Sequence, residues 1–374
     1  MFSFRFTLKK LSKILYLSFY FFLIFLDILT LFKIPKKNKK KNILLIKLDR
    51  FGDFILWNNH FNNILKYYEN KNIYLICNRQ LKTYLKKHYK KIIFITIDKY
   101  SFLFNLNYRI KKLLFLRNFF FYKVINFHRE RDIYFSDCIV KNISANEKIG
   151  NKIDEKNIIN FFSNKHYNRL IKTKKNSHET IFLNEFTNGL LENYFRNSNL
   201  IKFQKNKIYK KYKNCVLICY GGTDSKKNIS LKKMLNSLNI SNRKTKIVLL
   251  GNKNEIGEFN KQYDLYYKNI IDLSGKTSFD DFIYLHYLAK LVISNDSASG
   301  HLAHYFNKHS YTFLGGGHFE RFFPYPNKQI NKHKYIYKKL KCFNCNWNCI
   351  YDNLNLKSYP CIENINNLNI KIKV

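Results

Sequence analysis

The chain has 374 residues, of which 46% are apolar and 17% aromatic, so it is long enough for two domains with separate cores and too apolar for a disordered protein. Its 67 basic and 25 acidic residues give a formal net charge of +42, which attracts anionic partners. The lysines are scattered and no nucleic-acid-binding motif accompanies them, which favours a membrane surface over nucleic acid as the partner. A membrane-anchored RNA-binding protein is the interpretation that rests on charge alone.

The N-terminal residues form a hydrophobic segment with basic flanks. Residues 14–32 are an almost uninterrupted apolar run, about as long as a helix that crosses a bilayer. Lys9, Lys13 and Asp27 would share one face of such a helix, as in helices that lie in the membrane interface. We therefore expect residues 1–41 to be a membrane-associating segment on the cytoplasmic leaflet, peripheral or monotopic, although a single span also fits. No small-residue cleavage site follows, so we do not expect a signal peptide.

Beyond residue 41, short apolar runs alternate with longer amphipathic stretches. The first half of this region predicts strands at 43–48, 72–77, 91–97 and 123–127, with helices at 54–68 and up to about residue 88. This alternation is typical of a parallel, doubly wound sheet. A polar, lysine-rich zone at 196–214 interrupts the pattern and is the predicted domain boundary.

The same alternation starts again in the second half. It predicts strands at 215–220, 246–251, 291–294 and 311–317, with helices at 230–239, 278–289 and 299–307. The expected fold class is therefore α/β, with two Rossmann-like doubly wound domains facing each other across a cleft and a hydrophobic helix before them. The predicted domains are 42–205 and 206–340, followed by a cysteine-containing tail at 341–374. Ligands of such sheets bind beyond the carboxyl ends of the strands.

Three predicted strands of the second domain end in segments with phosphate-binding chemistry. Residues 221–227 read Gly-Gly-Thr-Asp-Ser-Lys-Lys, residues 295–301 read Asn-Asp-Ser-Ala-Ser-Gly-His, and residues 315–318 read Gly-Gly-Gly-His, with Arg321 shortly after. Glycines let the backbone approach an anion, helix N-termini present N–H groups, and hydroxyl and lysine side chains add donors and charge. Each segment alone is a weak signal, but three at one edge of a sheet indicate a site for a phosphate-containing ligand.

The first strand of the chain ends in a different kind of segment, Asp49-Arg50-Phe51-Gly52-Asp53. Asp49 and Arg50 suit a local ion pair that shapes the loop. Asp53 suits either of two roles: it could cap the helix that follows, where aspartate is favoured, or act as a general base at the strand end. The spacing alone does not separate these roles.

Four segments together resemble the heptosyltransferase-type glycosyltransferases of family 9. They are IKLDRFGDFIL, YGGTDSKKN, DLSGKTSFDDFIYLHYLAKLVISNDSASGHLA and LGGGHFERFFPYP, and the resemblance extends from about residue 42 to the end of the chain. It implies a GT-B fold, no metal ion and no cofactor, and transfer of a sugar from a nucleotide-sugar donor. In this family the donor is commonly ADP-heptose and the acceptor a lipid-linked core oligosaccharide at the inner membrane, in lipopolysaccharide or lipooligosaccharide biosynthesis.

The resemblance also implies roles for individual residues. Asp53 matches the family's general base, which removes a proton from the acceptor hydroxyl as that hydroxyl attacks the anomeric carbon. The candidates for donor binding are Gly222, Thr223, Lys227, Asp296, Ser297 and His301. The candidates for contacts with phosphate or acceptor are Arg50, Gly316, His318 and Arg321. The chain reads Ser-Ala-Ser-Gly at 297–300 where many members have Ser/Thr-Gly-Pro, and Glu255 is the candidate for the acid that binds the nucleotide.

We therefore expect an inverting, metal-independent glycosyltransferase on the cytoplasmic face of the inner membrane. Its expected partners are a nucleotide-sugar donor, a lipid-linked oligosaccharide acceptor and an anionic membrane surface. Two alternatives stay open: another nucleotide-sugar transferase of capsule or O-antigen synthesis, and a non-catalytic GT-B protein that binds glycolipid. The presence of Asp53, Lys227, Asp296 and His301 together argues against the second alternative.

Four cysteines lie near the C-terminus, spaced as Cys342-x2-Cys345-x3-Cys349-x11-Cys361. Four thiolates can bind a thiophilic metal, but this spacing is not that of a standard zinc finger. A structural metal, disulfide bonds and reduced thiols are all compatible with the sequence. We expect no catalytic role for these cysteines.

Overall fold

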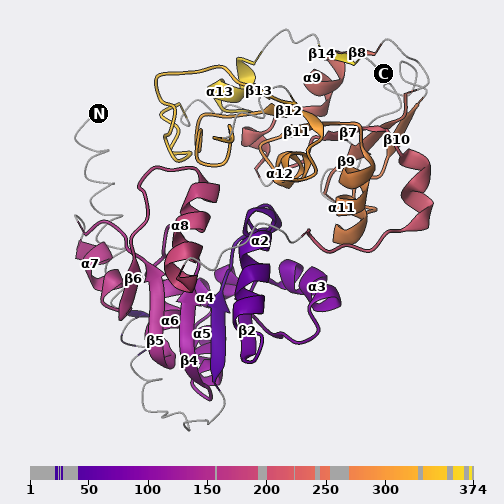
Figure 1. The fold of residues 1–374 in the computed structure, drawn as a ribbon. Coiled ribbons are helices and arrows are strands. Elements are labelled where there is room, and N and C mark those ends of the chain that lie inside the picture. Colours follow the sequence, from indigo (N-terminus) through magenta and orange to yellow (C-terminus); the bar gives the residue numbers. More distant parts are fainter. Residues whose placement is uncertain are drawn as a thin grey trace, which may run out of the picture. The chain divides into compact units, whose positions relative to one another are not determined.

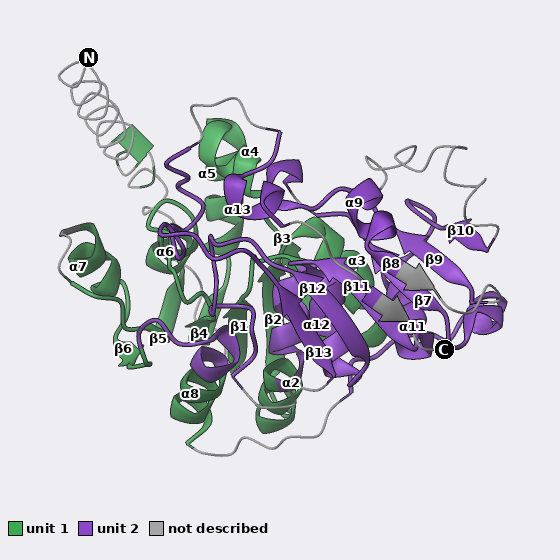
Figure 2. Ribbon diagram, turned by 90° about the horizontal axis from the view of Figure 1, so that it is seen from above, with its two compact units in different colours: residues 1–50, 60–174, 184–197 green, residues 51–59, 175–183, 198–374 purple. Residues whose placement is uncertain are grey.

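The computed structural model describes residues 22, 23, 25, 27, 41–155, 158–192, 200–222, 224–240, 245–252, 269–326, 332–351, 357–365 and 370–372 (Figure 1). Contacts divide the chain into two compact units (Figure 2). Unit 1 contains residues 1–50, 60–174 and 184–197, and unit 2 contains residues 51–59, 175–183 and 198–374. The helices α2 (Phe51–Tyr67) and α8 (Glu179–Leu191) therefore each contribute residues to both units. The domain boundaries expected from the sequence stay predictions.

Unit 1 is built on one parallel six-stranded sheet. Its strands, in spatial order, are β3 (Ile93–Thr96), β2 (Asn72–Cys77), β1 (Asn42–Ile46), β4 (Phe120–Asn126), β5 (Ser144–Asn151) and β6 (Arg169–Ile171). Strand β1 is buried at all five positions, because a central parallel strand is covered on both faces. The remaining helices of the unit are α3 (Arg79–His88), α4 (Lys99–Phe104), α5 (Leu106–Leu116), α6 (Ser136–Asn142) and α7 (Ile158–Asn164).

Unit 2 repeats this topology. Its main sheet is also parallel, with the order β10 (Ile270–Asp272), β9 (Ile247–Leu250), β7 (Val216–Cys219), β11 (Leu291–Asn295), β12 (His309–Phe313) and β13 (His333–Ile336). A small second sheet pairs β8 (Leu238–Ile240) with β14 (Ile370–Ile372). The helical segments are η1 (Lys207–Tyr212), η2 (Ser225–Lys227), α9 (Leu231–Asn236), α11 (Phe279–Leu288), α12 (Ala298–Tyr305) and α13 (Pro360–Glu363). All six strands are parallel, but the chain adds strands toward one edge of the sheet after β7 and toward the other edge from β11 onward. Ligands of doubly wound sheets bind at such a change in strand order.

The prediction of two doubly wound parallel sheets is confirmed. One boundary differs in a way that matters for the site, because the helix expected at 54–68 begins three residues earlier, at Phe51. The Phe51 ring packs against Phe279, with ring centroids 4.3 Å apart, a long-range contact that no local pattern reveals. Asp53 therefore lies inside the first turn of α2 and is not its N-cap. A carboxylate in this turn is favoured by the helix dipole.

Four residues of the hydrophobic segment are described, and all four are helical: Phe22, Leu23, Phe25 and Asp27. Leu23 and Asp27 are buried in unit 1, at 1% and 4% exposure. Asp27 accepts two hydrogen bonds from Arg109 on α5, from Nε at 2.8 Å and from an Nη nitrogen at 2.7 Å. Its carboxylate thus faces the protein. Among the described residues, no helix combines the length and the apolar character needed to cross a membrane.

The Asp27–Arg109 ion pair is almost fully buried, so each charge depends on the other for compensation. We predict that Asp27→Asn lowers the free energy of unfolding by about 3 kcal/mol, because it leaves the Arg109 guanidinium buried without a counter-charge. Lys99→Ala, which removes the exposed Lys99–Asp132 pair, is the matched control and should cost less than about 1 kcal/mol. Urea unfolding followed by circular dichroism measures both, and equal losses would contradict the prediction.

Candidate active site

The carboxyl ends of β7 and β11 are joined by one buried side chain, that of Asn295. Its amide nitrogen donates to the carbonyl oxygens of Tyr220 at 2.7 Å and Ile229 at 3.2 Å. Its amide oxygen accepts from the backbone N–H of Ile229 at 2.9 Å. Asn295 therefore holds both ends of the loop 220–229, which carries the Gly-Gly-Thr-Asp-Ser-Lys-Lys segment. From the sequence, Asn295 was only one position of a motif, and its hydrogen bonds to Tyr220 and Ile229 were not predicted.

Helix α12 begins directly after β11 and presents an unused hydroxyl. Ser297 occupies the N-cap position of α12 but forms no side-chain capping bond. Its Oγ is buried and has no hydrogen-bond partner among the described residues. A buried hydroxyl without a partner is costly in a folded protein. Together with the backbone N–H groups of the first turn of α12, it is suited to bind an anion at this position.

Two carboxylates and a lysine meet beside this helix start. The pKa of Asp296 is raised to about 6, because burial disfavours its charge and the Asp53 carboxylate repels it, while Lys227 offsets only part of the effect. Gly52 lies close by, since a Cβ added to it would meet the backbone of Ala298 at 3.6 Å. The structure thus brings together Asp53, Asp296 and Lys227 from three segments that are far apart in the sequence. A shifted pKa of this kind is typical of functional sites.

The C-terminal tail packs against the loop that carries Lys227. The Lys227 ammonium lies 4.6 Å from the ring centroid of Trp347 and 3.5 Å from a carboxylate oxygen of Asp224. The backbone N–H of Tyr359 donates to the carbonyl of Lys226 at 3.0 Å. About a third of the Lys227 side chain is exposed, which leaves its ammonium able to reach a ligand. The tail therefore positions this lysine.

The glycines of the site pack closely against other side chains. A Cβ on Gly316 would clash with the Phe343 ring, and one on Gly317 would clash with the Trp347 ring. A Cβ on Gly222 would clash with the side chain of Asn228. These positions therefore need glycine for packing. The sequence suggested a different reason for these glycines, namely that they let the backbone approach a phosphate. That role stays a prediction.

His301, the fourth residue of α12, lies in a cluster of aromatic side chains. Its Nδ1 is 2.9 Å from the hydroxyl of Tyr325, and its ring stacks on Phe323 with centroids 4.4 Å apart. Burial, together with the nearby His178 and His304, lowers its pKa to about 3. His301 is therefore a neutral side chain at physiological pH. It can exchange hydrogen bonds with a donor sugar or phosphate, but it brings no positive charge.

The other two basic candidates of unit 2 lie in the loop after β12. The His318 ring contacts Phe322 and Trp347, with centroids 5.7 Å and 6.1 Å away. The Arg321 guanidinium lies over Phe322 at 5.0 Å, and its Nε is 3.6 Å from a carboxylate oxygen of Glu179. Glu179 was not singled out from the sequence, and it offsets part of the charge of Arg321.

An ion pair and a hydrogen bond lie at the carboxyl end of β1. Lys47 Nζ lies 2.6 Å from a carboxylate oxygen of Asp49. The backbone N–H of Leu48 donates to Nε2 of His128 at 2.9 Å, so this nitrogen carries no proton and the imidazole is neutral. Burial is the main reason that the pKa of His128 is lowered. Lys47 is therefore one ionic partner of Asp49, and the ion pair of Asp49 with Arg50 expected from the sequence stays a prediction. Arg50 is exposed at the last position before α2.

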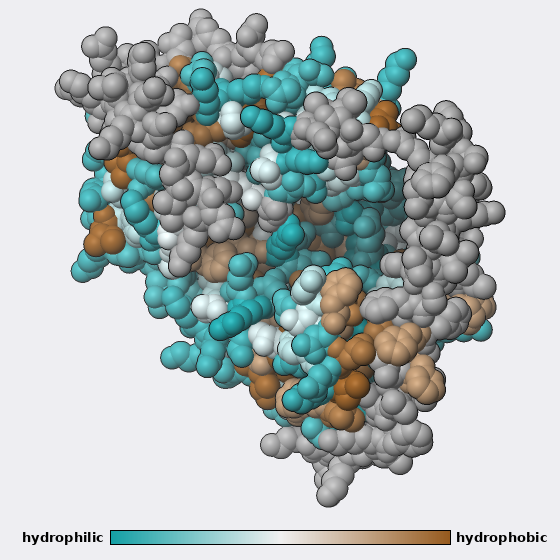
Figure 3. Space-filling model, turned by 180° about the vertical axis from the view of Figure 1, so that it is seen from behind, coloured by the Kyte–Doolittle hydropathy of each residue, from teal (hydrophilic) through white to brown (hydrophobic). Residues whose placement is uncertain are grey.

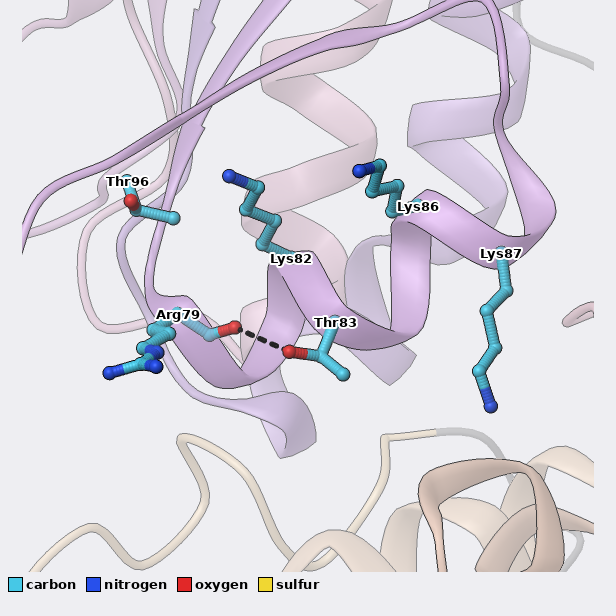
Figure 4. Close-up of a pocket in the computed structure, with 6 residues that line it drawn as sticks. All are labelled: Arg79, Lys82, Thr83, Lys86, Lys87 and Thr96. Atoms are coloured by element: carbon cyan, nitrogen blue, oxygen red, sulfur yellow. Dashed lines mark hydrogen bonds between the residues drawn. The ribbon is translucent and has the colours of Figure 1, made fainter.

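A basic hollow lies on α3 of unit 1 (Figure 4). It has a volume of about 400 Å³ and is lined by Arg79, Lys82, Thr83, Lys86, Lys87 and Thr96. Figure 4 shows Lys82 and Lys86 extending to the same side of the helix, whereas Lys87 points elsewhere. Within the described part of the chain, Lys82 and Lys86 form no ion pair with an acid. The nearby Lys82 also contributes, after burial, to a lowered pKa of Lys112.

The four cysteines of the tail are free thiols. Burial raises the pKa of Cys361, and the neighbouring thiols Cys342, Cys345 and Cys349 add to this effect, so the four lie near one another. Among the described residues, no group of three or more histidine, cysteine or acidic side chains has the arrangement of a metal site. Two further candidates, Thr223 and Glu255, lie outside the described residues.

The raised pKa of Asp296 predicts a pH-dependent cost in stability. A carboxyl that binds its proton more tightly in the folded state than in the unfolded state destabilises the protein above about pH 6, and the cost disappears below about pH 4. We predict that Asp296→Asn raises the free energy of unfolding at pH 8 by on the order of 2 kcal/mol and changes little at pH 4. Urea unfolding at both pH values measures the difference.

Asp98→Asn serves as the control with the opposite sign. Hydrogen bonds from Ser101 lower the pKa of Asp98, so its carboxylate stabilises the fold at neutral pH and the variant should be less stable there. If Asp296→Asn instead loses stability at pH 8, the Asp296 carboxylate makes net favourable contacts and the reading of this site is wrong.

Comparisons with known proteins agree with this architecture. The model of glycosyltransferase family 9 (heptosyltransferase) matches residues 144–350, which is more than half of the chain. A search of the curated proteins found no match.

Solved structures share the fold at low sequence identity. E. coli heptosyltransferase WaaC with ADP-2-deoxy-2-fluoro heptose is similar at a TM-score of 0.58 and 12% identity, covering 82% of this chain and 97% of that chain. The glycosyl transferase family 9 protein of Veillonella parvula DSM 2008 has a TM-score of 0.55 at 13% identity, covering 79% and 85%. E. coli ADP-heptose lps heptosyltransferase II has a TM-score of 0.53 at 13% identity, covering 84% and 97%. The chain belongs to glycosyltransferase family 9 and is a glycosyltransferase of the GT-B fold.

Proposed function

We propose that this glycosyltransferase moves a heptose or a related sugar, with inversion, from an ADP-sugar to a lipid-linked core oligosaccharide. The reaction is expected to need no metal and to take place at the cytoplasmic face of the inner membrane. The observation that carries the proposal is the start of α12, where the buried hydroxyl of Ser297 has no hydrogen-bond partner among the described residues. Lys227 acts electrostatically on Asp296, the residue before Ser297. A donor diphosphate suits this place because it accepts hydrogen bonds and carries negative charge.

The residues at this place have complementary tasks in such a reaction. Lys227 would neutralise the charge that builds up on the departing diphosphate, and the α12 N–H groups with Ser297 would donate to its oxygens. The Asp296 carboxylate would repel phosphate but can accept hydrogen bonds from sugar hydroxyls. Asp53 would accept the proton of the attacking hydroxyl. It acts electrostatically on Asp296, and a sugar that binds at Asp296 would therefore have its reacting carbon near Asp53.

The basic hollow on α3 supports an anionic acceptor. Two of its lysines, Lys82 and Lys86, have no acid partner within the described part of the chain, and such charges attract phosphorylated glycans. Core oligosaccharides carried on a phosphorylated lipid fit this chemistry. An acceptor of this kind would also explain part of the +42 net charge.

Substitutions at Asp53 and Lys227 should separate catalysis from donor binding. We predict that Asp53→Asn lowers kcat by at least about a hundredfold while donor affinity stays near normal, because only the proton acceptor is lost. Lys227→Ala should weaken donor binding by at least about tenfold, because a charge-assisted contact is lost. Lys226→Ala is the matched control, since this ammonium lies over Tyr359 at 5.9 Å. Near-normal turnover in Asp53→Asn would show that the base is another residue.

Charge reversal in the α3 hollow should act on the acceptor alone. We predict that the double variant Lys82→Glu and Lys86→Glu raises the KM for acceptor by about tenfold at low salt, with kcat and donor affinity unchanged. The control is Lys290→Glu, an exposed lysine of unit 2. Steady-state kinetics at two salt concentrations measure both variants. An unchanged KM in the double variant would remove the hollow from the acceptor site.

A further inference from the structure

An apolar cluster in unit 1 joins the N-terminal helical residues to the body of the unit. Its buried members are Leu23, Ile133 and Tyr134, and the partly buried side chains packed against them are Leu103, Leu106 and Ile159. Leu103 belongs to α4 and Ile159 to α7. The N-terminal helix, α4 and α7 are therefore neighbours around one cluster.

The same three elements expose aromatic side chains to solvent. These side chains, which we name the aromatic surface, are Phe22 (47% exposed), Phe25 (62%), Tyr100 (74%), Phe104 (63%), Phe161 (40%) and Phe162 (49%). They account for six of the fifteen large hydrophobic side chains that are exposed in the described part of the chain. Figure 3, which shows the molecule from behind, has hydrophilic residues over much of the described surface and a group of hydrophobic residues toward the bottom of the view. Aromatic side chains gathered at a surface are typical of proteins that enter the lipid–water interface.

The buried ion pair fixes which face of the N-terminal helix is exposed. Leu23 and Asp27 are four positions apart and therefore share one helical face, which is turned into unit 1. Phe22 and Phe25 consequently point outward. Because a rotation of the helix would leave the Arg109 guanidinium buried and unpaired, the outward position of these phenylalanines is specified by the fold.

Positive charge accompanies the aromatic surface. Lys165 Nζ lies 4.3 Å from the ring centroid of Phe161. Asp98 caps α4 and Asp132 binds Lys99, so both acids are engaged within the protein. Asp154 and Glu155, which precede α7, are exposed, and Glu155 accepts a hydrogen bond from the Asn164 amide at 2.8 Å. Lysines beside interfacial aromatic residues bind the phosphates of anionic lipids, as does a chain with a strongly positive net charge.

We propose that the aromatic surface is the face by which this protein lies on an anionic lipid bilayer, with the Asp27–Arg109 pair holding its N-terminal part in place. The inference deepens the proposed function and rests on it in one respect, since a lipid-linked acceptor requires the enzyme to work at a membrane. It adds the particular surface, formed by the N-terminal helix, α4 and α7, that makes the contact.

Vesicle binding by the full chain tests this proposal. The double variant Tyr100→Ser and Phe104→Ser removes two exposed rings without touching the core, and the double variant Leu200→Ser and Ile208→Ser is the control. Leu200 and Ile208 are exposed to the same degree, 74% and 63%, but belong to unit 2. Co-sedimentation with vesicles that contain phosphatidylglycerol should show about tenfold weaker binding for the first variant and unchanged binding for the control.

Further arms identify what is bound. Vesicles of phosphatidylcholine alone should bind the wild type more weakly, Lys165→Glu should weaken binding to anionic vesicles, and inorganic phosphate should not compete. Equal vesicle binding by the two double variants, or a changed oligomeric state in place of changed vesicle binding, would overturn the proposal. Calorimetry with ADP-sugar on the same variants should give wild-type affinity, so a failure of the proposed donor site is seen separately from a failure of the membrane surface.

Discussion

The candidate site at the carboxyl ends of β7 and β11 depends on one buried amide, that of Asn295. Parallel pairing of β7 with β11 brings two chain segments to the same sheet edge, and Asn295 then binds the backbone at both ends of the loop 220–229. Without this link the two ends of the loop would lose their side-chain hydrogen bonds to the end of β11. The start of α12 follows Asn295 by only three residues. Asn295 therefore fixes the backbone of the loop that carries Lys227 next to the segment of Asp296 and Ser297, and Trp347 of the tail contacts the lysine side chain.

The order of elements could be predicted from the sequence because both sheets are parallel and buried. Strands such as β1 and β11 are continuous apolar runs, and the polar segments that follow them mark the sheet edge. The sequence placed the start of α2 three residues too late, since the helix begins at Phe51, whose ring contacts Phe279, more than two hundred residues away. Asp53 therefore lies in the first turn of the helix, and the N-cap role considered for it was wrong.

The sequence identified several residues of the candidate site but not the surroundings that determine their charge and position. The motifs indicated Asp296, Ser297 and Lys227, which the structure brings near one another. They could not show that His301 is neutral, since its environment of Tyr325, Phe323 and neighbouring histidines is assembled from distant segments. Nor could they show that Trp347 and Tyr359 of the tail contact the loop 220–229 at Lys227 and Lys226. From the sequence, residues 1–41 were expected to be a membrane-associating segment separate from the two domains. Asp27 of this segment is nevertheless buried in unit 1. Removing residues 1–41 to obtain a more tractable protein would therefore leave Arg109 without its counter-charge.

The central claim is that the start of α12 and Lys227 bind the diphosphate of an ADP-sugar. Isothermal titration calorimetry of the full chain with ADP-, GDP-, UDP- and CDP-sugars, with and without EDTA, tests it most directly when wild type and Ser297→Ala are compared. The account predicts micromolar binding of ADP-heptose that EDTA does not change and that weakens in Ser297→Ala. Absence of binding to every nucleotide sugar, or binding that Ser297→Ala leaves intact, would contradict it.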